Sequence, residues 1–222
     1  MSVKENLLAV KRQLPQGTEL VAVSKFHPVD VVMQAYEAGQ RIFGENRAQE
    51  LVAKAPQMPD DICWHFIGHL QTNKVRQIIP YVSMIQSVDS VRLLQLINKE
   101  AQRIGRTVDV LLQLHVAQEE AKSGFAVDEL LTVLTLGEMD GLEAVRIRGL
   151  MAMASLTEDE QQIEREFALV QHTFDVVKEE FFADANDFDQ ISMGMSHDWP
   201  IAVRHGSTLV RVGTAIFGPR EY

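Results

Sequence analysis

Short apolar runs alternate along the chain with longer segments in which apolar residues recur at helical spacing. Each run is too short for a helix and therefore predicts a buried strand. The predicted strands cover residues 20–25, 42–43, 64–67, 84–87, 110–115, 147–151, 190–193 and 208–212. Helical spacing predicts helices over residues 3–14, 28–38, 47–54, 72–79, 91–104 and 128–136, and another that begins near residue 157.

Two helix starts can be assigned from their polar residues. Ser90 is expected to cap the helix that follows the fourth strand. The stretch Thr157-Glu158-Asp159-Glu160 fits a capping box, and its carboxylates suit a helix N-terminus without any catalytic role.

The alternation of strands and helices predicts a parallel sheet with helical crossovers. Eight such units in 222 residues favour an α/β fold that closes as a (β/α)8 barrel, with an open doubly wound sheet as the alternative. The chain stops soon after the eighth strand, so the helix at residues 3–14 is expected to replace the missing eighth outer helix. No linker is visible, and residues 1–222 are predicted to form one domain.

Composition narrows the classes of partner. A net charge of −10 argues against nucleic acid and against an anionic membrane surface. The first residues lack the basic start and apolar block of a signal peptide, and no apolar run approaches the about 20 residues of a membrane span. The one cysteine, Cys63, is expected to be a buried, inert thiol, which fits a reducing cytoplasm.

Lys25 closes the first predicted strand, immediately before a helix. In α/β proteins ligands bind at the carboxyl ends of the strands. A lysine whose pKa is lowered by its surroundings forms a Schiff base with a carbonyl group. The ordinary alternative is a solvated lysine, so the assignment depends on what else collects at this face.

In a barrel the strand ends share one face, and that face holds the active site. Ser192 to Ser196 and Gly213-Thr214 offer hydroxyl and backbone N–H groups after strands seven and eight, where barrels often bind phosphate. Arg211 alternates with apolar neighbours and is expected to point into the barrel mouth. The set predicts a site for a phosphorylated aldehyde, although the glycines could be simple turn formers. The same face is expected to hold Asn46, His69, Asp89, His115 and Met151.

At these positions the sequence resembles the pyridoxal phosphate homeostasis proteins (the YggS/PROSC family), which are similar to the barrel domain of bacterial alanine racemases. The resemblance runs through nearly the whole chain and is specific because its motifs occur together and in order. The motifs are Val21–Lys25, Phe43–Asn46, Trp64–Lys74, Arg148–Met151, Ser192–Asp198 and Val210–Thr214. One local departure is Arg47, where the family pattern has a bulkier, often aromatic residue.

The resemblance implies that Lys25 holds pyridoxal 5′-phosphate (PLP) as a Schiff base and that Arg211 faces the pyridine nitrogen. The other residues that it implies are Ser196, Gly213 and Thr214 at the phosphate, Ser192 as a weaker phosphate candidate, and Asn46 and Met151 along the ring. An arginine at the ring nitrogen supports carbanion chemistry poorly, because PLP is a strong electron sink only when that nitrogen is protonated.

The leading hypothesis is therefore a non-enzymatic PLP carrier that buffers or delivers the cofactor inside the cell. A weak PLP-dependent amino-acid racemase is the rival, and a Schiff-base aldolase acting on a sugar phosphate is a third hypothesis. The tyrosines Tyr36, Tyr81 and Tyr222 are poor candidates for a second racemase acid–base group. PLP-dependent apoenzymes or a regulatory protein are possible partners, and a monomer is expected.

Overall fold

The computed structural model describes residues 2–118 and 123–219. It contains eight parallel strands, each hydrogen-bonded to the next, with β1 also paired to β8. The strands are β1 Glu19–Val23, β2 Ile42–Glu45, β3 Cys63–Phe66, β4 Val82–Val88, β5 Val108–Leu114, β6 Val145–Ala152, β7 Gln190–Ser192 and β8 Leu209–Val212. The predicted closed (β/α)8 barrel is confirmed, and the open-sheet alternative is excluded.

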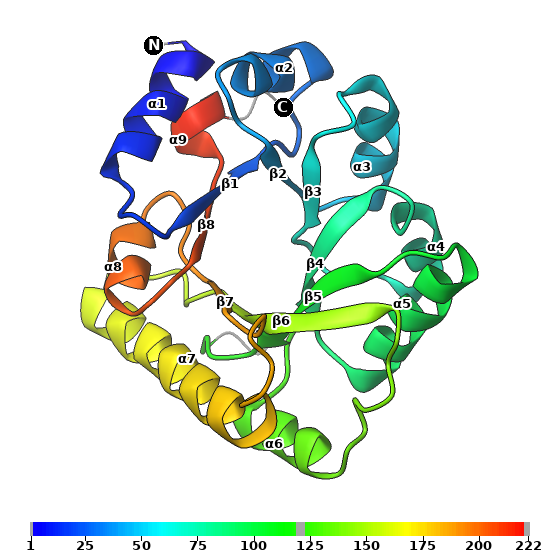
Figure 1. The fold of residues 1–222 in the computed structure, drawn as a ribbon. Helices are drawn as coiled ribbons and strands as arrows, with labels where there is room; N and C mark the ends of the chain where they lie inside the picture. Colours follow the sequence, from blue (N-terminus) through cyan, green and yellow to red (C-terminus); the bar gives the residue numbers. More distant parts are fainter. Residues whose placement is uncertain (1, 119–122, 220–222) are drawn as a thin grey trace.

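Helices surround this barrel (Figure 1). They are α1 Val3–Gln13, α2 Val29–Glu37, α3 Ala48–Lys54, α4 Val75–Ile78, α5 Val91–Arg103, α6 Val127–Thr135, α7 Glu160–Phe181, α8 Trp199–Arg204 and α9 Thr214–Phe217, with 3-10 turns η1 Ala55–Gln57 and η2 Thr72–Lys74. The short helices α8 and α9 were not predicted. No helix within the described ranges is both long enough and apolar enough to cross a membrane.

Helix α1 packs against α9 and α2, at the side of the barrel where β1 meets β8 (Figure 1). The side-chain amide of Asn6 donates to the carbonyl oxygen of Ile216 at 3.0 Å, which joins the first helix to the last. Helix α1 thus lies beside the strand pair that closes the barrel, as expected, but it packs on the short helix α9 after β8 and does not replace a missing one.

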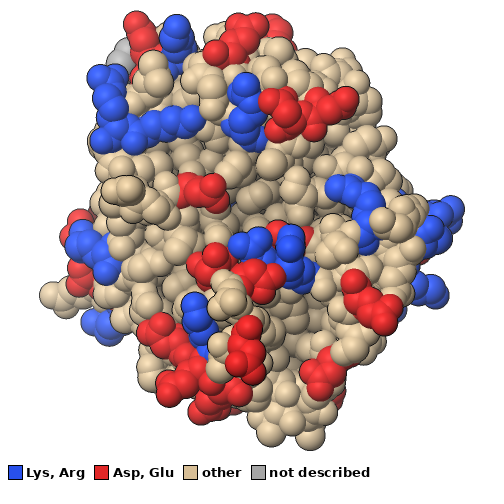
Figure 2. Space-filling model, in the orientation of Figure 1, with Lys and Arg blue, Asp and Glu red and all other residues tan. Residues whose placement is uncertain are grey.

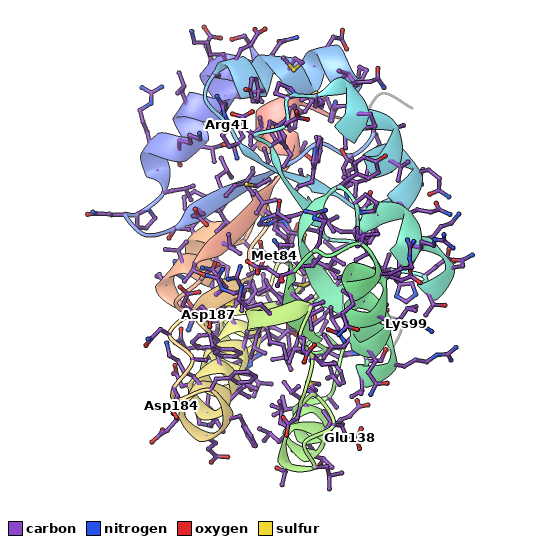
Figure 3. The ribbon with its side chains drawn as sticks, turned by 45° about the vertical axis from the view of Figure 1, so that its right-hand side comes forward. Arg41, Met84, Lys99, Glu138, Asp184 and Asp187 are labelled. Carbon is purple, nitrogen blue, oxygen red and sulfur yellow. The ribbon has the colours of Figure 1, made fainter. Side chains whose placement is uncertain are left out.

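Two apolar layers stabilise the barrel. The larger one lies between the strands and the outer helices, and it takes the side chains that point outward from the strands. A smaller cluster fills the barrel interior, where side chains alternate with the outward ones. Its buried members are Val21, Met84, Leu111, Met151 and Leu209, of which Met84 is labelled in Figure 3.

Two local predictions are corrected by the structure. Asp159, and not Thr157, caps α7: its carboxylate accepts from the backbone N–H groups of Gln161 and Gln162, and the helix begins at Glu160. Cys63 is exposed instead of buried, because it is the first residue of β3 and lies at the rim of the barrel. Ser90 caps α5 as predicted and accepts from Leu93 N–H at 3.3 Å.

Candidate functional site

A cavity of about 530 Å³ opens at the carboxyl ends of the strands. Almost every strand contributes to it, either through its last residues or through the loop that follows. The lining residues are Val23, Lys25, Asn46, Ile67, Gly68, His69, Gln113, Ser123, Met153, Met195, Ser196, His197, Arg211, Gly213 and Thr214. Most of the predicted site residues therefore share one cavity: Lys25, Asn46, Ser196, Arg211, Gly213 and Thr214.

Met151 does not line the cavity. It is fully buried in the barrel-interior cluster, and Met153 takes its place at the mouth. The reason is that β6 extends to Ala152, beyond the predicted end at residue 151. Residues two apart on a strand point to the same side, so the longer strand moves the mouth position from Met151 to Met153.

Ser192 does not line the cavity either, but it contacts Arg211, which does. Arg211 is 4% exposed, and its Nη1 donates to Ser192 Oγ at 2.6 Å while Nη2 donates to the carbonyl oxygen of Ala152 at 2.8 Å. Burial lowers the pKa of Arg211 to about 10, and the charge of Asp198 opposes part of that shift. The guanidinium is therefore still charged at neutral pH.

The contact between Arg211 and Ser192 continues through the barrel interior as a directed chain of hydrogen bonds. Ser192 Oγ donates to Gln86 Oε1 at 2.6 Å, and Gln86 Nε2 lies 2.8 Å from Nδ1 of His65. Because Gln86 Nε2 can only donate, His65 Nδ1 accepts and its proton lies on Nε2. Burial lowers the pKa of His65 to about 4, so this end of the chain is neutral.

The sequence analysis placed neither His65 nor Gln86 at the site. The available signal was a polar amide in the middle of an apolar strand, which must find partners when it is buried. Gln113 gives the same signal on β5: it lines the cavity, and its Nε2 donates to Ser123 O at 2.6 Å. His115 does not line the cavity; its Nε2 lies 3.0 Å from Ala117 O.

The loops after β7 and β8 form the side of the cavity predicted to bind phosphate. Gly194 has φ +93, and an added Cβ would lie 2.7 Å from Ala202 Cβ, so only glycine fits this turn. The turn leads to Ser196, while Arg211 N–H donates to Gly194 O and ties the two loops together. Thr214 begins α9, where the first N–H groups have no partner within the helix.

The opposite side of the cavity carries Asn46, Gly68 and His69. Asn46 lines the cavity, and its Oδ1 is buried without a hydrogen-bond partner among the described residues. An added Cβ at Gly68 would run into the backbone of Asn46, so the two loops are in close contact. His69 Nδ1 lies 3.2 Å from Asp89 Oδ2 and 3.3 Å from Ser123 Oγ. No cluster of three or more potential metal ligands occurs within the described part of the chain.

Lys25 itself follows β1 after the buried Ser24 and precedes Phe26, whose φ of +69 is unusual for a residue other than glycine. Arg47 stacks on the Phe26 ring with its guanidinium carbon 4.7 Å from the ring centroid. The residue that departs from the family pattern therefore packs beside the turn that carries Lys25.

A family model and individual relatives both match nearly the whole of this chain. The family model described as "Alanine racemase, N-terminal domain" matches residues 1–221. The pyridoxal phosphate homeostasis protein of Haemophilus influenzae is 34% identical, covering 100% of this chain and 98% of that protein. The human protein of the same description is 39% identical over 95% of this chain and 80% of its own length.

Solved structures of other proteins have the same fold as this chain. PipY of Synechococcus elongatus, solved with PLP bound, has a TM-score of 0.89 and 36% identity, covering 98% of this chain and 100% of that one. The alanine racemase of Clostridium difficile has a TM-score of 0.76 at 14% identity, covering 97% of this chain and 56% of that one, and shows only that the fold is shared. This chain belongs to the pyridoxal phosphate homeostasis protein family and is built on an alanine racemase N-terminal domain.

Proposed function

We propose that this protein binds PLP as a Schiff base on Lys25 and holds it for buffering or delivery, without strong catalytic activity. The observation that carries the proposal is that one cavity is lined both by Lys25 and by the loops after β7 and β8. A primary amine and a phosphate-binding loop on one cavity are the two features that a phosphorylated aldehyde requires.

The chemistry of the lining fits PLP group by group. Ser196, Gly213 and Thr214 would hold the phosphate through hydroxyl and backbone N–H donors, and Arg211 would face the ring nitrogen. Asn46, which lines the same cavity, would lie along the ring. The cavity volume also lies within the roughly 300–1,000 Å³ typical of small-molecule pockets. PLP in the related PipY supports the same cofactor here.

The low catalytic activity that we propose rests on Arg211. Bound PLP supplies an electrophilic aldehyde and, when its ring nitrogen is protonated, an electron sink for carbanions. Arg211 stays charged at neutral pH and its donors can only donate, so it would favour an unprotonated ring nitrogen. The site would therefore retain the aldehyde but support carbanion chemistry weakly.

The racemase alternative needs acid–base groups on both faces of a substrate carbon. Among the described residues no tyrosine lines the cavity, and Tyr36 donates from its hydroxyl to Asp61 Oδ1 at 2.8 Å, while Tyr222 lies outside the described residues. His69 and His197 do line the cavity, so the alternative has to be tested by experiment.

The test titrates PLP into the purified protein and into Lys25→Ala while visible absorbance reports the Schiff base. We expect a saturable absorbance band in the wild type, none in Lys25→Ala, and exchange of the alanine α-proton no faster than with free PLP. Exchange well above that of free PLP and lost in Lys25→Ala would instead make the protein an enzyme. Transfer of bound PLP to a PLP-free apoenzyme would test delivery. The monomeric state and cytoplasmic location stay predictions.

A further inference from the structure

An ion cluster lies beside the turn that carries Lys25, with Lys54 and Glu45 buried and Glu50 partly exposed. Lys54 Nζ donates to the carbonyl oxygen of Ser24 at 2.9 Å, to Glu45 Oε1 at 2.8 Å and to Glu50 Oε2 at 3.2 Å. The ammonium group thus uses all three of its donors. The side chains of Lys54 and Glu45 are 9% and 0% exposed, so the pair is shielded from water.

This cluster binds both neighbours of Lys25. On one side, Ser24 accepts from Lys54 through its carbonyl oxygen and donates from Oγ to Glu45 Oε1 at 2.7 Å. On the other side, Phe26 N–H donates to Glu50 Oε2 at 2.7 Å. The backbone is therefore fixed immediately before and immediately after Lys25.

The fixed conformation is a strained one. Phe26 has φ +69, in the left-handed region that residues other than glycine, asparagine and aspartate rarely adopt. Such conformations persist only when surrounding contacts impose them, and they concentrate at functional sites. The hydrogen bond from Phe26 N–H to Glu50 is a contact that imposes this one.

Stability alone does not explain the cluster. A buried ion pair is often no more stabilising than apolar side chains of similar size, because both charges lose their hydration. Here Glu45 Oε2 is also buried with no hydrogen-bond partner among the described residues. Burial raises the pKa of Glu45, and Lys54 and the Ser24 hydroxyl oppose part of that shift.

We propose that Lys54, Glu45 and Glu50 are positioning residues that set the direction in which Lys25 leaves β1. The inference deepens the proposed function and rests on it. In the covalent step the Lys25 amine nitrogen forms a C=N bond with the aldehyde carbon, and the aldehyde oxygen leaves as water. A turn already held in place presents the amine in a reactive direction and so speeds this step.

The first experiment compares Glu50→Ala with Glu164→Ala, a control that also removes a helix carboxylate from an ion pair, the one with Arg204 at 2.7 Å. Stopped-flow absorbance would follow Schiff-base formation after PLP is mixed with each protein. We expect Glu50→Ala to slow formation roughly tenfold, within the range that a small misplacement of a reacting group produces. Glu164→Ala should react at the wild-type rate. A Glu50→Ala protein that reacts as fast as wild type overturns the proposal.

A readout without PLP separates this proposal from the proposed function. Hydrogen exchange of a peptide covering residues 20–28 should speed up in Glu50→Ala and stay unchanged in Glu164→Ala, because only the first frees the Phe26 N–H. If the wild type forms no Schiff base on Lys25, the proposed function fails whatever this peptide shows. If the wild type reacts but exchange and rate are both unchanged in Glu50→Ala, positioning fails alone.

A rescue variant guards against a merely destabilised fold. Asparagine adopts positive φ more readily than phenylalanine, so Phe26→Asn should recover much of the rate lost in Glu50→Ala. Lys54→Met should slow the reaction as Glu50→Ala does, provided that its circular dichroism matches the wild type. If the double variant Phe26→Asn/Glu50→Ala reacts no faster than Glu50→Ala, Glu50 does not act through the turn and the proposal is wrong.

Discussion

The arginines at the two ends of the barrel have different hydrogen-bond partners. At the amino ends of the strands, Arg148 contacts Asp109 at 3.0 Å and Asp189 at 2.9 Å, and Arg146 contacts Asp109 at 2.7 Å and Asp187 at 3.6 Å. Figure 2 shows acidic and basic side chains next to one another near the middle of the face in view, and Figure 3 labels Asp187.

At the carboxyl ends, Arg211 donates to a hydroxyl and a backbone carbonyl instead of to carboxylates. Burial lowers the pKa of Arg148 too, but hydrogen bonds and charges from Asp189 and Asp109 outweigh it and raise the pKa. For Arg211 burial prevails, and the pKa falls to about 10.

The difference separates structural charges from functional ones. The arginines at the amino ends are satisfied by the chain's own carboxylates. Arg211 uses two of its five donors on described residues while it lines the cavity, so it keeps donors for a ligand. Changes at the carboxyl end should therefore alter PLP binding, and changes at the amino end should alter only stability.

The largest expected effect is on how stability depends on pH. It comes from His65, which ends the series of hydrogen bonds that begins at Arg211. Its folded pKa of about 4 lies below the ordinary histidine value of 6.5, so the unfolded chain takes up a proton that the folded chain does not. Stability is therefore lost as the pH falls from about 6.5 to about 4, by about 3 kcal/mol for this residue.

Urea unfolding at several pH values would measure this loss in the wild type and in His65→Gln, whose amide can still accept from Gln86. We expect a flatter pH dependence in the variant. If the two proteins lose stability in parallel between about pH 6.5 and 4, His65 does not titrate as its burial requires.

The next effect is on PLP affinity. Arg211→Met should weaken PLP binding about thirtyfold, because a hydrogen bond with a charged donor contributes about 2 kcal/mol. Stability should change by no more than about 1 kcal/mol, since the variant also removes a buried charge. Equilibrium titration and thermal unfolding would measure the two quantities. An unchanged affinity would mean that Arg211 is as structural as Arg148.

A smaller effect is expected at the phosphate loops. Thr214→Val removes a hydroxyl at the start of α9 and should weaken PLP binding about tenfold, near the lower end for a charge-assisted hydrogen bond, because this residue is exposed to water. Pyridoxal, which has no phosphate, is the matched ligand and should bind both proteins equally. Equal losses for the two ligands would place the phosphate elsewhere.

The smallest effect is expected at the amino end. Arg148→Met should lower the free energy of unfolding by about 1 kcal/mol, the upper end for partly exposed ion pairs, and less at high salt. PLP affinity should be unchanged. Denaturation at low and high salt, with a parallel PLP titration, would check this. A loss of PLP affinity in Arg148→Met would show that the amino ends of the strands also affect binding, which contradicts the proposed difference between the two ends.

Much of this organisation could be predicted from the sequence. Short apolar runs indicated the eight strands, and the rule that ligands bind at strand ends placed Lys25, Asn46 and Arg211 on one face. These predictions succeed because they depend on local patterns and on a single geometric rule.

The remaining features depend on contacts between distant residues. The place of Met153 in the cavity required the true end of β6, which apolar periodicity alone does not determine. The hydrogen bonds through Gln86, and the bond from Lys54 to the Ser24 carbonyl 30 residues away, join residues that no local pattern connects. Cys63 was expected to be buried because its neighbours are apolar, although its place at the start of a strand exposes it.

The most direct test of the central claim is to reduce the PLP-loaded protein with borohydride and to locate the pyridoxyl group by peptide mass spectrometry. We predict one modified residue, Lys25, at close to one pyridoxyl group per chain, and none at Lys54 or Lys74. A protein that binds PLP but carries the pyridoxyl group on another lysine, or on none, would contradict the claim.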